Sequence, residues 1–268
     1  MRTGNVPAAL TIAGSDPSGG AGLQADLETF AAHGVHGCSA VTAVTSQNTV
    51  GITGSVVLGA DLVGAQIEAI AADIPIRAVK TGMLGAAAVV EAVAAAIGQL
   101  DLPQVVVDPV MVSSSGTRLL DADGVQMLRA ELLPRALVVT PNVPEAEVLS
   151  GVAISSPRDA QEAARRIQGL GCSAVIVTGG HAPGDEVVDL LFDGRTFHQC
   201  RTLRMAAPGG VHGTGCTFAA AVAANLALGC PLLDAAARAQ AYVAGAIAHA
   251  RAIGRGAALL DHFWRTSG

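Results

Sequence analysis

Short apolar runs rich in Val and Ile alternate with longer Ala-rich stretches over most of the chain. The short runs are apolar at nearly every position, which is typical of strands buried on both faces. The predicted strands are Ala8–Ala13, Cys38–Thr42, Ile76–Lys80, Gln104–Val107, Leu137–Thr140 and Ala174–Thr178. The predicted helices between them are Ala21–Ala32, Asp61–Ala72, Ala86–Leu100, Thr117–Leu132 and Pro157–Leu170. This alternation predicts right-handed crossovers and a mostly parallel sheet with helices on both faces.

The pattern changes late in the chain. Val187–Phe192 and Arg195–Arg204 flank Asp193-Gly194, which is a strong hairpin signal, so we expect antiparallel strands there. Two Ala-rich helices are predicted after them, over Gly213–Leu228 and Pro231–Ile253. No linker, repeat or low-complexity tract interrupts the chain, so we expect one domain over residues 1–268.

Composition excludes several classes of protein. With 51% hydrophobic and 14% charged residues, the chain is not of a disordered type. Its longest apolar stretches, such as Ala86–Ile97, are too short or interrupted to span a bilayer, and the first residues lack the pattern of a secretion signal. The five cysteines form no CxxC pair, which favours reduced thiols in the cytoplasm. A net charge of −6 with one Trp and one Tyr argues against nucleic-acid binding.

Polar and glycine-rich segments follow nearly every predicted strand. Ligands of open α/β sheets bind at the carboxyl ends of the strands, so these segments predict an active site there. They are Gly14–Gly22, Thr45–Thr49, Thr81–Gly85, Asp108–Gly116, Pro141–Glu145 and Gly179–His181.

The sharpest motif opens the helix predicted at Gly213. It reads Gly-Thr-Gly-Cys-Thr from Gly213 to Thr217. Glycines allow close approach of an anion, and the exposed N–H groups with the helix dipole favour a phosphate. Cys216 falls in the first turn, where we expect the pKa of a thiol to be lowered. A plain glycine-rich turn with a small buried cysteine is the alternative.

Two common phosphate-binding motifs are absent from the sequence. The lone lysine, Lys80, lacks the glycine spacing of a Walker A loop, and the first glycine-rich loop does not read GxGxxG. That loop still offers a backbone cradle, and Asp26 one turn later could accept a hydrogen bond from a substrate amine. A solvated Asp after a simple turn is the other interpretation.

Two acidic residues lie where a metal could bind. Asp108 and Glu145 follow predicted strands, the right place to hold Mg²⁺ directly or through water. Helix capping is the competing interpretation. Lys80 ends an apolar strand and is hard to dismiss, since lysine is rarely buried unpaired. His181 and His212 have no metal-ligand spacing and are interpreted as loop residues.

Taken together, these segments resemble the hydroxymethylpyrimidine/phosphomethylpyrimidine kinases of thiamine biosynthesis, within the ribokinase-like superfamily. The resemblance covers almost the whole chain, in order. The matching stretches are Ala9–Asp26, Thr45–Thr49, Lys80–Leu84, Val107–Met111, Thr140–Glu145, Gly179–His181 and His212–Thr217. It implies a three-layer αβα sandwich with a mostly parallel central sheet and antiparallel strands late in the chain.

The resemblance also implies site roles. Cys216 is similar to the family's general base, and Gly213, Thr214 and Gly215 to its anion hole. The pyrimidine pocket would be formed by Gly14, Asp26, Gln47, Met83 and Val110. Binding of ATP and Mg²⁺ would use Asp108, Asn142, Glu145 and Thr178, with Asp108 and Glu145 as metal ligands. A homodimer is implied as well.

Two departures from the family pattern concern the nucleotide side. Thr178 stands where a lysine near the phosphates is usual, and the loop from Ala206 to Val211 lacks the usual polar pair. Two alternatives stay open. One is pyridoxal kinase activity, which the same motif set supports, and the other is a non-catalytic vitamin-binding module.

Overall fold

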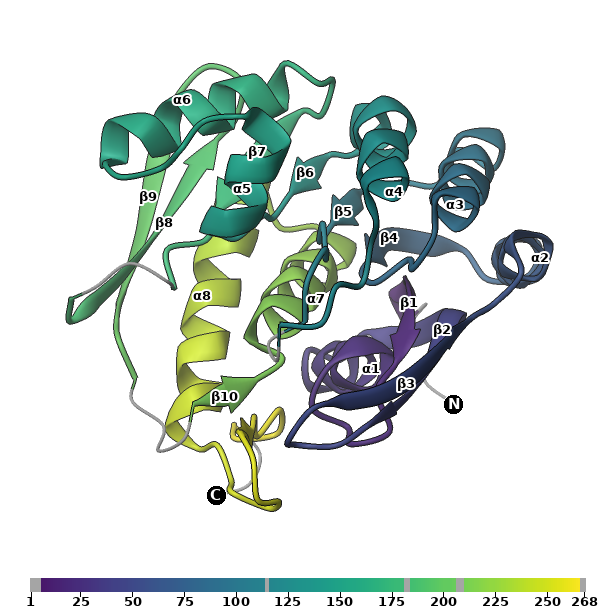
Figure 1. Cartoon of the computed structure of the whole chain (residues 1–268), viewed down its shortest axis with the longest axis horizontal. Coiled ribbons are helices and arrows are strands. Elements are labelled where there is room, and N and C mark those ends of the chain that lie inside the picture. The colour runs from purple at the N-terminus through teal and green to yellow at the C-terminus, as the bar shows by residue number, and fades with distance from the viewer. Residues whose placement is uncertain (1–5, 114–115, 181–183, 206–209, 266–268) are drawn as a thin grey trace.

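The computed structural model describes residues 6–113, 116–180, 184–205 and 210–265 (Figure 1). Its centre is a nine-stranded sheet in the order β3-β2-β1-β4-β5-β6-β7-β8-β9. The strands are β1 Ala8–Ser15, β2 His36–Gln47, β3 Ile52–Val57, β4 Ile76–Thr81, β5 Val105–Val107, β6 Val138–Val139, β7 Ala174–Val177, β8 Glu186–Phe192 and β9 Phe197–Leu203. A separate two-stranded sheet pairs β10 Val211–His212 with β11 Ala258–Leu259.

The directions of the strands agree with the sequence-based prediction. The strands from β2 through β1, β4, β5 and β6 to β7 pair in parallel, whereas β7–β8 and β8–β9 are antiparallel. The αβα fold class with antiparallel strands late in the chain is therefore confirmed. The division into domains stays a prediction, although all described strands except β10 and β11 share one sheet.

One hairpin at the edge of the sheet was not predicted. β2 runs past Thr42 to Gln47, turns, and pairs antiparallel with β3. The turn is closed by the Asn48 side chain, which accepts hydrogen bonds from the backbone N–H groups of Val50 and Gly51. β3 is mostly exposed, so it lacks the continuous apolar signal of the buried strands. Thr45 and Gln47 thus lie within a strand and not in the loop after it.

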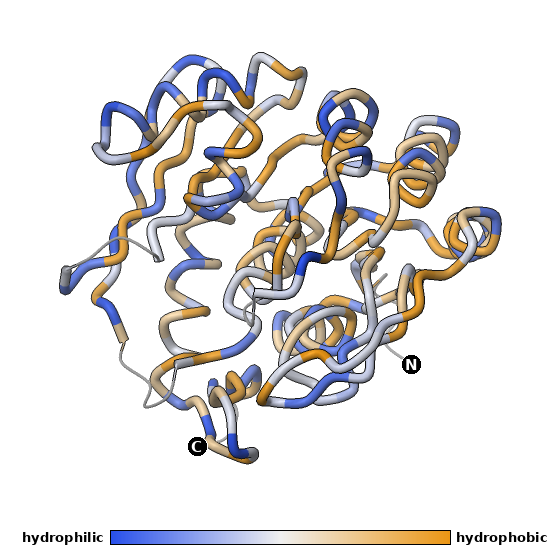
Figure 2. The backbone as a smooth tube through the Cα atoms, viewed as in Figure 1, coloured by the Kyte–Doolittle hydropathy of each residue, from blue (hydrophilic) through white to orange (hydrophobic). Residues whose placement is uncertain are grey.

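Helices cover both faces of the sheet (Figure 1). One face packs against α2 Ala60–Ala71, α3 Ala87–Gln99, α4 Ala122–Met127, α5 Val143–Ser150 and α6 Pro157–Gln168. The opposite face packs against α1 Gly22–Ala32, α7 Thr214–Ala227 and α8 Leu232–Ala248. The backbone tube of Figure 2 shows hydrophobic residues gathered in the inner strands and polar ones on the outer helix faces.

The helix predicted over Thr117–Leu132 was too long. α4 begins at Ala122, where Asp121 caps it by accepting from the Gly124 N–H. It continues into a π-helical turn over Leu128–Leu132 and a 3-10 turn over Leu133–Arg135.

α7 is buried on all sides from Thr217 to Ala227. A helix that is apolar all round belongs in an interior, and this one is held between α1, α8 and the sheet. Its rigid position fixes the first turn, which carries the glycine-rich motif. Among the described helices, none is long and apolar enough to cross a membrane.

Candidate active site

The start of α7 fits tightly against the loop between β1 and α1. Gly213 is the N-cap, with φ of +84°, a left-handed conformation that favours glycine. A Cβ atom at this position would collide with the carbonyl of Gly20. Thr214, Gly215 and Cys216 follow as the first turn, whose N–H groups have no partner within the helix. The structure therefore has a helix N-terminus where the sequence predicted one, a geometry that favours an anion, and the anion hole itself stays a prediction.

Lys80 lies beneath this terminus and is fully buried. Its Nζ is 2.8 Å from Oδ2 of Asp26 and 4.0 Å from Oδ2 of Asp108. Burial by itself lowers the pKa of the lysine, but the two carboxylates outweigh it and hold that pKa above its ordinary value. Lys80 is therefore a permanent buried cation, charged at physiological pH.

The predicted role of Asp26 in the substrate pocket stays a prediction, and the structure adds an ion pair to it. Its side chain is fully buried and accepts hydrogen bonds from Thr11 (2.6 Å) and Lys80 (2.8 Å). Its other oxygen, Oδ1, is buried and has no hydrogen-bond partner among the described residues, whereas Oδ2 forms the ion pair with Lys80. Sequence spacing could not reveal this, because Lys80 and Asp26 lie 54 residues apart. The position of Asp26 fits that of a counterion which holds Lys80 under the site.

The Cys216 thiol is half-buried and hydrogen-bonded to Asp108. Desolvation, with added repulsion from Asp108 and Asp26, raises the pKa of this thiol to about 12, although Lys80 and the Gly22 N–H act in the opposite direction. The expected lowering of the pKa by the helix terminus was therefore wrong. Two neighbouring carboxylates and burial outweigh the helix dipole here.

Asp108 interacts both with the Cys216 thiol and with the buried charge of Lys80. Burial raises the pKa of its carboxyl to about 6, against the effect of Lys80. Its Oδ2 is buried and has no hydrogen-bond partner among the described residues. A buried carboxylate oxygen of this kind usually faces a group that binds there.

Gly14 and Met83 lie in contact at the carboxyl ends of β1 and β4. A Cβ atom on Gly14 would lie 3.0 Å from the Met83 sulfur, so a larger residue there would require a small shift of Met83. The Met83 carbonyl accepts a hydrogen bond of 2.6 Å from Thr42. Val110, two residues after Asp108, is half-buried. These residues could line an apolar wall for a flat ring.

Gln47 takes part in a polar network across the site. Its Nε2 lies 2.8 Å from Nε2 of His212, and the same His212 nitrogen lies 3.0 Å from Oδ2 of Asp16. Asp16 and His212 are both buried. Thr45 Oγ is 3.3 Å from Gln47 Oε1. His212 therefore links the β1–α1 loop to the end of β2.

His212 and Asp16 are the functional candidates that the sequence interpretation missed. His212 was assigned to a loop because it has no metal-ligand spacing, and Asp16 was not singled out. The available signal was position: Asp16 lies in the first glycine-rich loop and His212 directly precedes Gly213. His181 and residues 206–209 lie outside the described part of the chain.

Asn142, Glu145 and Thr178 form the other end of the site. Asn142 accepts from the Glu145 N–H at 3.0 Å, and Glu145 accepts from the Asn142 N–H at 2.9 Å. This is a complete capping box for α5, so the capping interpretation is confirmed as a structural fact. Thr178 forms a β-bridge with Asn142. Burial, followed by repulsion from Asp108, raises the pKa of Glu145 to about 8.

The donor set can be tested for a divalent metal. Among the described residues, no cluster of three or more His, Cys, Asp or Glu could hold one. Mg²⁺, however, usually binds to one or two carboxylates together with phosphate oxygens and water. Asp108 and Glu145 repel each other, and the buried Oδ2 of Asp108 has no hydrogen-bond partner among the described residues, with Lys80 Nζ 4.0 Å away. This pair fits a Mg²⁺ ion bound with a phosphorylated ligand.

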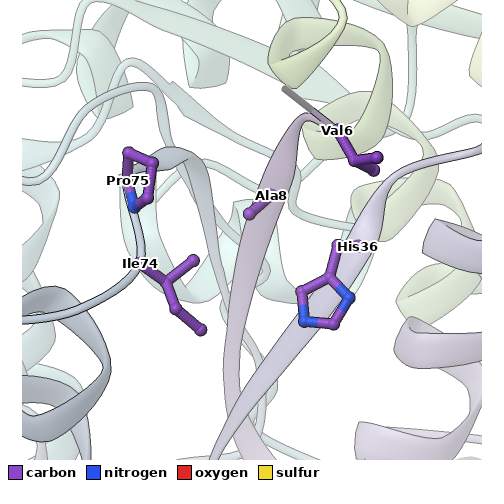
Figure 3. A pocket seen from close by; sticks show the side chains of 5 residues that line it. All are labelled: Val6, Ala8, His36, Ile74 and Pro75. Atoms are coloured by element: carbon purple, nitrogen blue, oxygen red, sulfur yellow. The ribbon is translucent and has the colours of Figure 1, made fainter. Parts of the chain in front are cut away.

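A shallow hollow at the opposite edge of the sheet is not this site. Figure 3 shows its lining residues, Val6, Ala8, His36, Ile74 and Pro75. They lie at the amino ends of β1, β2 and β4, and His36 is the one titratable side chain among them. The hollow lacks the convergent polar groups found at the carboxyl ends.

Comparisons with known proteins point to one family. Residues 16–261 match the family model described as phosphomethylpyrimidine kinase. A hydroxymethylpyrimidine/phosphomethylpyrimidine kinase of Synechococcus elongatus is 49% identical over 97% of this chain and 98% of its own.

Solved structures agree with this match. A phosphomethylpyrimidine kinase of Clostridium difficile has a TM-score of 0.79 at 38% identity, over 90% of this chain and 99% of its own. A pyridoxal kinase of Staphylococcus aureus in complex with ADP has a TM-score of 0.91 at 37% identity, over 98% of this chain and 96% of its own.

Proposed function

The chain belongs to the phosphomethylpyrimidine kinase family, and we propose that it transfers the γ-phosphate of ATP to the hydroxymethyl group of an aminopyrimidine. The acceptors are 4-amino-5-hydroxymethyl-2-methylpyrimidine and its monophosphate, as in thiamine biosynthesis. One observation carries the proposal: the Cys216 thiol, in a first helix turn whose N–H groups have no partner within the helix, interacts electrostatically with the buried charge of Lys80.

The acceptor occupies the side of the site formed by Gly14, Gln47, Met83 and Val110. The apolar faces of Met83 and Val110 contact the flat ring, and the carboxamide of Gln47 hydrogen-bonds its polar edge. A larger residue at Gly14 would displace the Met83 sulfur by a few tenths of an ångström. The hydroxymethyl group then points at Cys216.

Cys216 takes the proton of the acceptor hydroxyl. A thiol with a pKa of about 12 is mostly protonated at neutral pH, and its rare thiolate is a strong base. Lys80 and the Gly22 N–H favour the thiolate. Because the transition state of phosphoryl transfer is loose, the hydroxyl proton leaves late, and a strong base is well suited to it.

The first turn of α7 stabilises the transferring phosphoryl group. The N–H groups of Thr214, Gly215 and Cys216 act as the anion hole, because they are aligned with the helix dipole before the reaction starts. The charge of Lys80 adds to this through space, since its side chain is fully buried and its ammonium donates to Asp26.

We propose Mg²⁺ as the metal, held by Asp108 and Glu145. When bound, it would neutralise charge on the phosphate oxygens of ATP. Asn142 orients Glu145 through the capping box, and Thr178 lies beside Asn142 on the nucleotide side.

Pyridoxal kinase activity is a second candidate function. It is favoured by the S. aureus pyridoxal kinase, which aligns over 98% of this chain. The higher identity to the S. elongatus pyrimidine kinase, 49% against 37%, places the aminopyrimidine first.

An ATP-consumption assay with three acceptors tests the function. Hydroxymethylpyrimidine, its monophosphate and pyridoxal are compared at equal concentrations. We expect turnover with both pyrimidines and less with pyridoxal. Gln47→Leu should weaken acceptor binding by about 1–3 kcal/mol and leave ATP binding unchanged. Absence of transfer to every acceptor would favour a binding module, and equal losses for both substrates would remove Gln47 from the acceptor pocket.

We further propose a cytoplasmic location and a homodimer, as the family resemblance implies. Val44 of β2 and Val56 of β3 support an assembly surface. They are register partners on the edge hairpin and are 50% and 67% exposed. Light scattering of the wild type and of Val56→Lys measures the state: a dimer that the substitution weakens supports the proposal, and a wild-type monomer contradicts it.

A further inference from the structure

With Nε2 of Gln47 facing His212, the hydrogen bonds of the Asp16–His212–Gln47 network cannot all be satisfied. The Asp16 carboxylate accepts from the Ser18 N–H, the Ser18 hydroxyl and the Ala21 N–H, and its pKa is lowered, despite burial, by hydrogen bonds that include His212. An ionised Asp16 requires a hydrogen on the His212 Nε2, 3.0 Å away. That nitrogen then cannot accept from the Gln47 amide.

The other end of the carboxamide supports the same conclusion. The single Thr45 hydroxyl hydrogen is donated to the Ser15 carbonyl at 2.9 Å. Thr45 Oγ can therefore accept from Gln47 but cannot also donate strongly to it. With Oε1 toward Thr45 and Nε2 toward His212, both contacts are mismatched. Rotating the amide by 180° corrects both at once.

We propose that Asp16 and His212 are positioning residues that hold the Gln47 amide with Oε1 toward His212. This proposal rests on the proposed function. His212 donates its Nε2 hydrogen to Asp16 and Gln47 together, and the Gln47 NH₂ donates to Thr45. The outer edge of the amide then presents one acceptor and one donor side by side, in a fixed order.

Such an edge recognises a ring nitrogen next to an amino group. An amide of Gln or Asn pairs in this bidentate way with adenine, whose amino group also neighbours a ring nitrogen. A 4-aminopyrimidine has this pair of groups, and the pyridine ring of pyridoxal does not. His212 therefore contributes to specificity. Without it, the Gln47 amide can rotate by 180° and bind rings with either order of donor and acceptor.

The surrounding backbone keeps the imidazole in place. A Cβ atom on Gly20 would lie 2.8 Å from Cδ2 of His212, so the glycine leaves a slot in which the ring sits. His212 also belongs to β10, which is paired with β11. The ring is thereby fixed from two sides before any ligand arrives.

Two single substitutions of His212 test the proposal. His212→Gln keeps an N–H near the Nε2 position, and His212→Leu removes it. We expect His212→Leu to raise the acceptor KM by about 5–30-fold with little change in the KM for ATP. His212→Gln should remain near wild type. In His212→Leu, the preference for aminopyrimidine over pyridoxal should fall.

A double-mutant cycle shows whether His212 acts through Gln47. If it does, His212→Leu has little further effect on acceptor KM in a Gln47→Leu background. Additive losses in the double variant, or equal changes in the KM for acceptor and ATP, would overturn the proposal.

Nitrogen-15 NMR of the histidines in the wild-type protein shows which ring nitrogen of His212 carries the hydrogen. This measurement does not depend on whether the variants fold. A protonated Nε2 on His212 is expected, and a bare Nε2 would overturn the proposal. This readout needs no turnover. If the wild type binds the aminopyrimidine but does not phosphorylate it, the proposed function fails while the positioning role is still decided by calorimetric binding and by NMR.

Discussion

The two ends of the candidate site are built in different ways. On the acceptor side, side chains from distant segments hold one another: Gln47 and His212 are 165 residues apart, and Asp16 and His212 are 196 apart. On the nucleotide side, Asn142 and Glu145 are three residues apart and form a local helix cap. The acceptor side also contains the buried Lys80, whereas Thr178 stands on the nucleotide side where the family usually has a lysine.

This difference indicates how each end achieves its task. The acceptor side fixes the polarity of its groups before binding, as recognition of a small ring requires. In our proposal the nucleotide side relies on backbone groups, on two carboxylates and on a cation supplied with the ligand. Substitutions on the acceptor side should therefore have the larger effects, and added charge on the nucleotide side should improve binding.

The largest effect is expected for Cys216→Ala, which should lower kcat by about 10²–10⁴-fold while the protein remains folded. Cys216→Asp should retain partial activity. In the wild type, kcat should rise toward alkaline pH because the pKa of the thiol is raised to about 12, and the rise should be absent in Cys216→Asp. Steady-state kinetics with circular dichroism measure both.

Cys230→Ala is the matched control, since Cys230 is also a half-buried thiol but lies beyond the other end of α7. It should behave like the wild type. Near-normal turnover of Cys216→Ala would mean that the thiol only packs, and the acceptor side would lose its base.

Lys80→Met should destabilise the fold by about 3–5 kcal/mol, because it leaves the carboxylates of Asp26 and Asp108 buried without a cation. Arg166→Met is the control: it removes the cation of an exposed pair with Glu162, which is worth about 0–1 kcal/mol. Urea unfolding of the two variants measures the difference. Equal losses of unfolding free energy in the two variants would contradict the role of Lys80 as the cation that neutralises the buried carboxylates.

Thr178→Lys tests the nucleotide side by adding the missing charge. A lysine beside Asn142 that reaches a phosphate should strengthen ATP binding by about 1–3 kcal/mol, and the dependence on Mg²⁺ should become less strict. Lys80 cannot supply this charge, since it is buried on β4 and paired with Asp26.

Thr178→Met, which adds length without charge, is the control for that titration. Unchanged or weaker ATP binding in Thr178→Lys would mean that the end of β7 does not lie beside the nucleotide.

The smallest expected effect is the contribution of Glu145 to the pH dependence of folding stability. Its pKa is raised to about 8 from an ordinary 4.5, so the folded protein binds this proton more tightly than the unfolded chain does. The resulting stability is present below about pH 4.5 and is lost as pH rises through 8. Between pH 6 and 8.5 the ligand-free protein should lose roughly 1–3 kcal/mol from this group.

Glu145→Gln keeps the capping box, since Gln serves at that position as well as Glu, and should flatten this dependence. Thermal unfolding across the pH range measures it. A slope that is the same in Glu145→Gln would contradict the raised pKa. Saturating Mg²⁺ with a nucleotide should also reduce the slope, because a bound cation favours the ionised carboxylate.

Much of this protein could be inferred from residue order alone. The parallel core followed from continuous apolar runs such as Val105–Val107, because strands covered on both faces have no polar side. The start of α7 followed from Gly213 and its neighbours, since a helix terminus and its glycines are local features. The same holds for the capping box of Asn142 and Glu145, three residues apart.

Only the tertiary structure decided which side chains meet. It paired Asp26 with Lys80, and it raised the pKa of Cys216, which local helix position alone predicts to fall. It brought His212 onto Gln47 and Asp16 and paired the exposed β3 with β2. Hydrophobic periodicity reports burial one segment at a time. Hydrogen bonds and electrostatic interactions depend on distances of a few ångströms between segments that only the folded chain brings together.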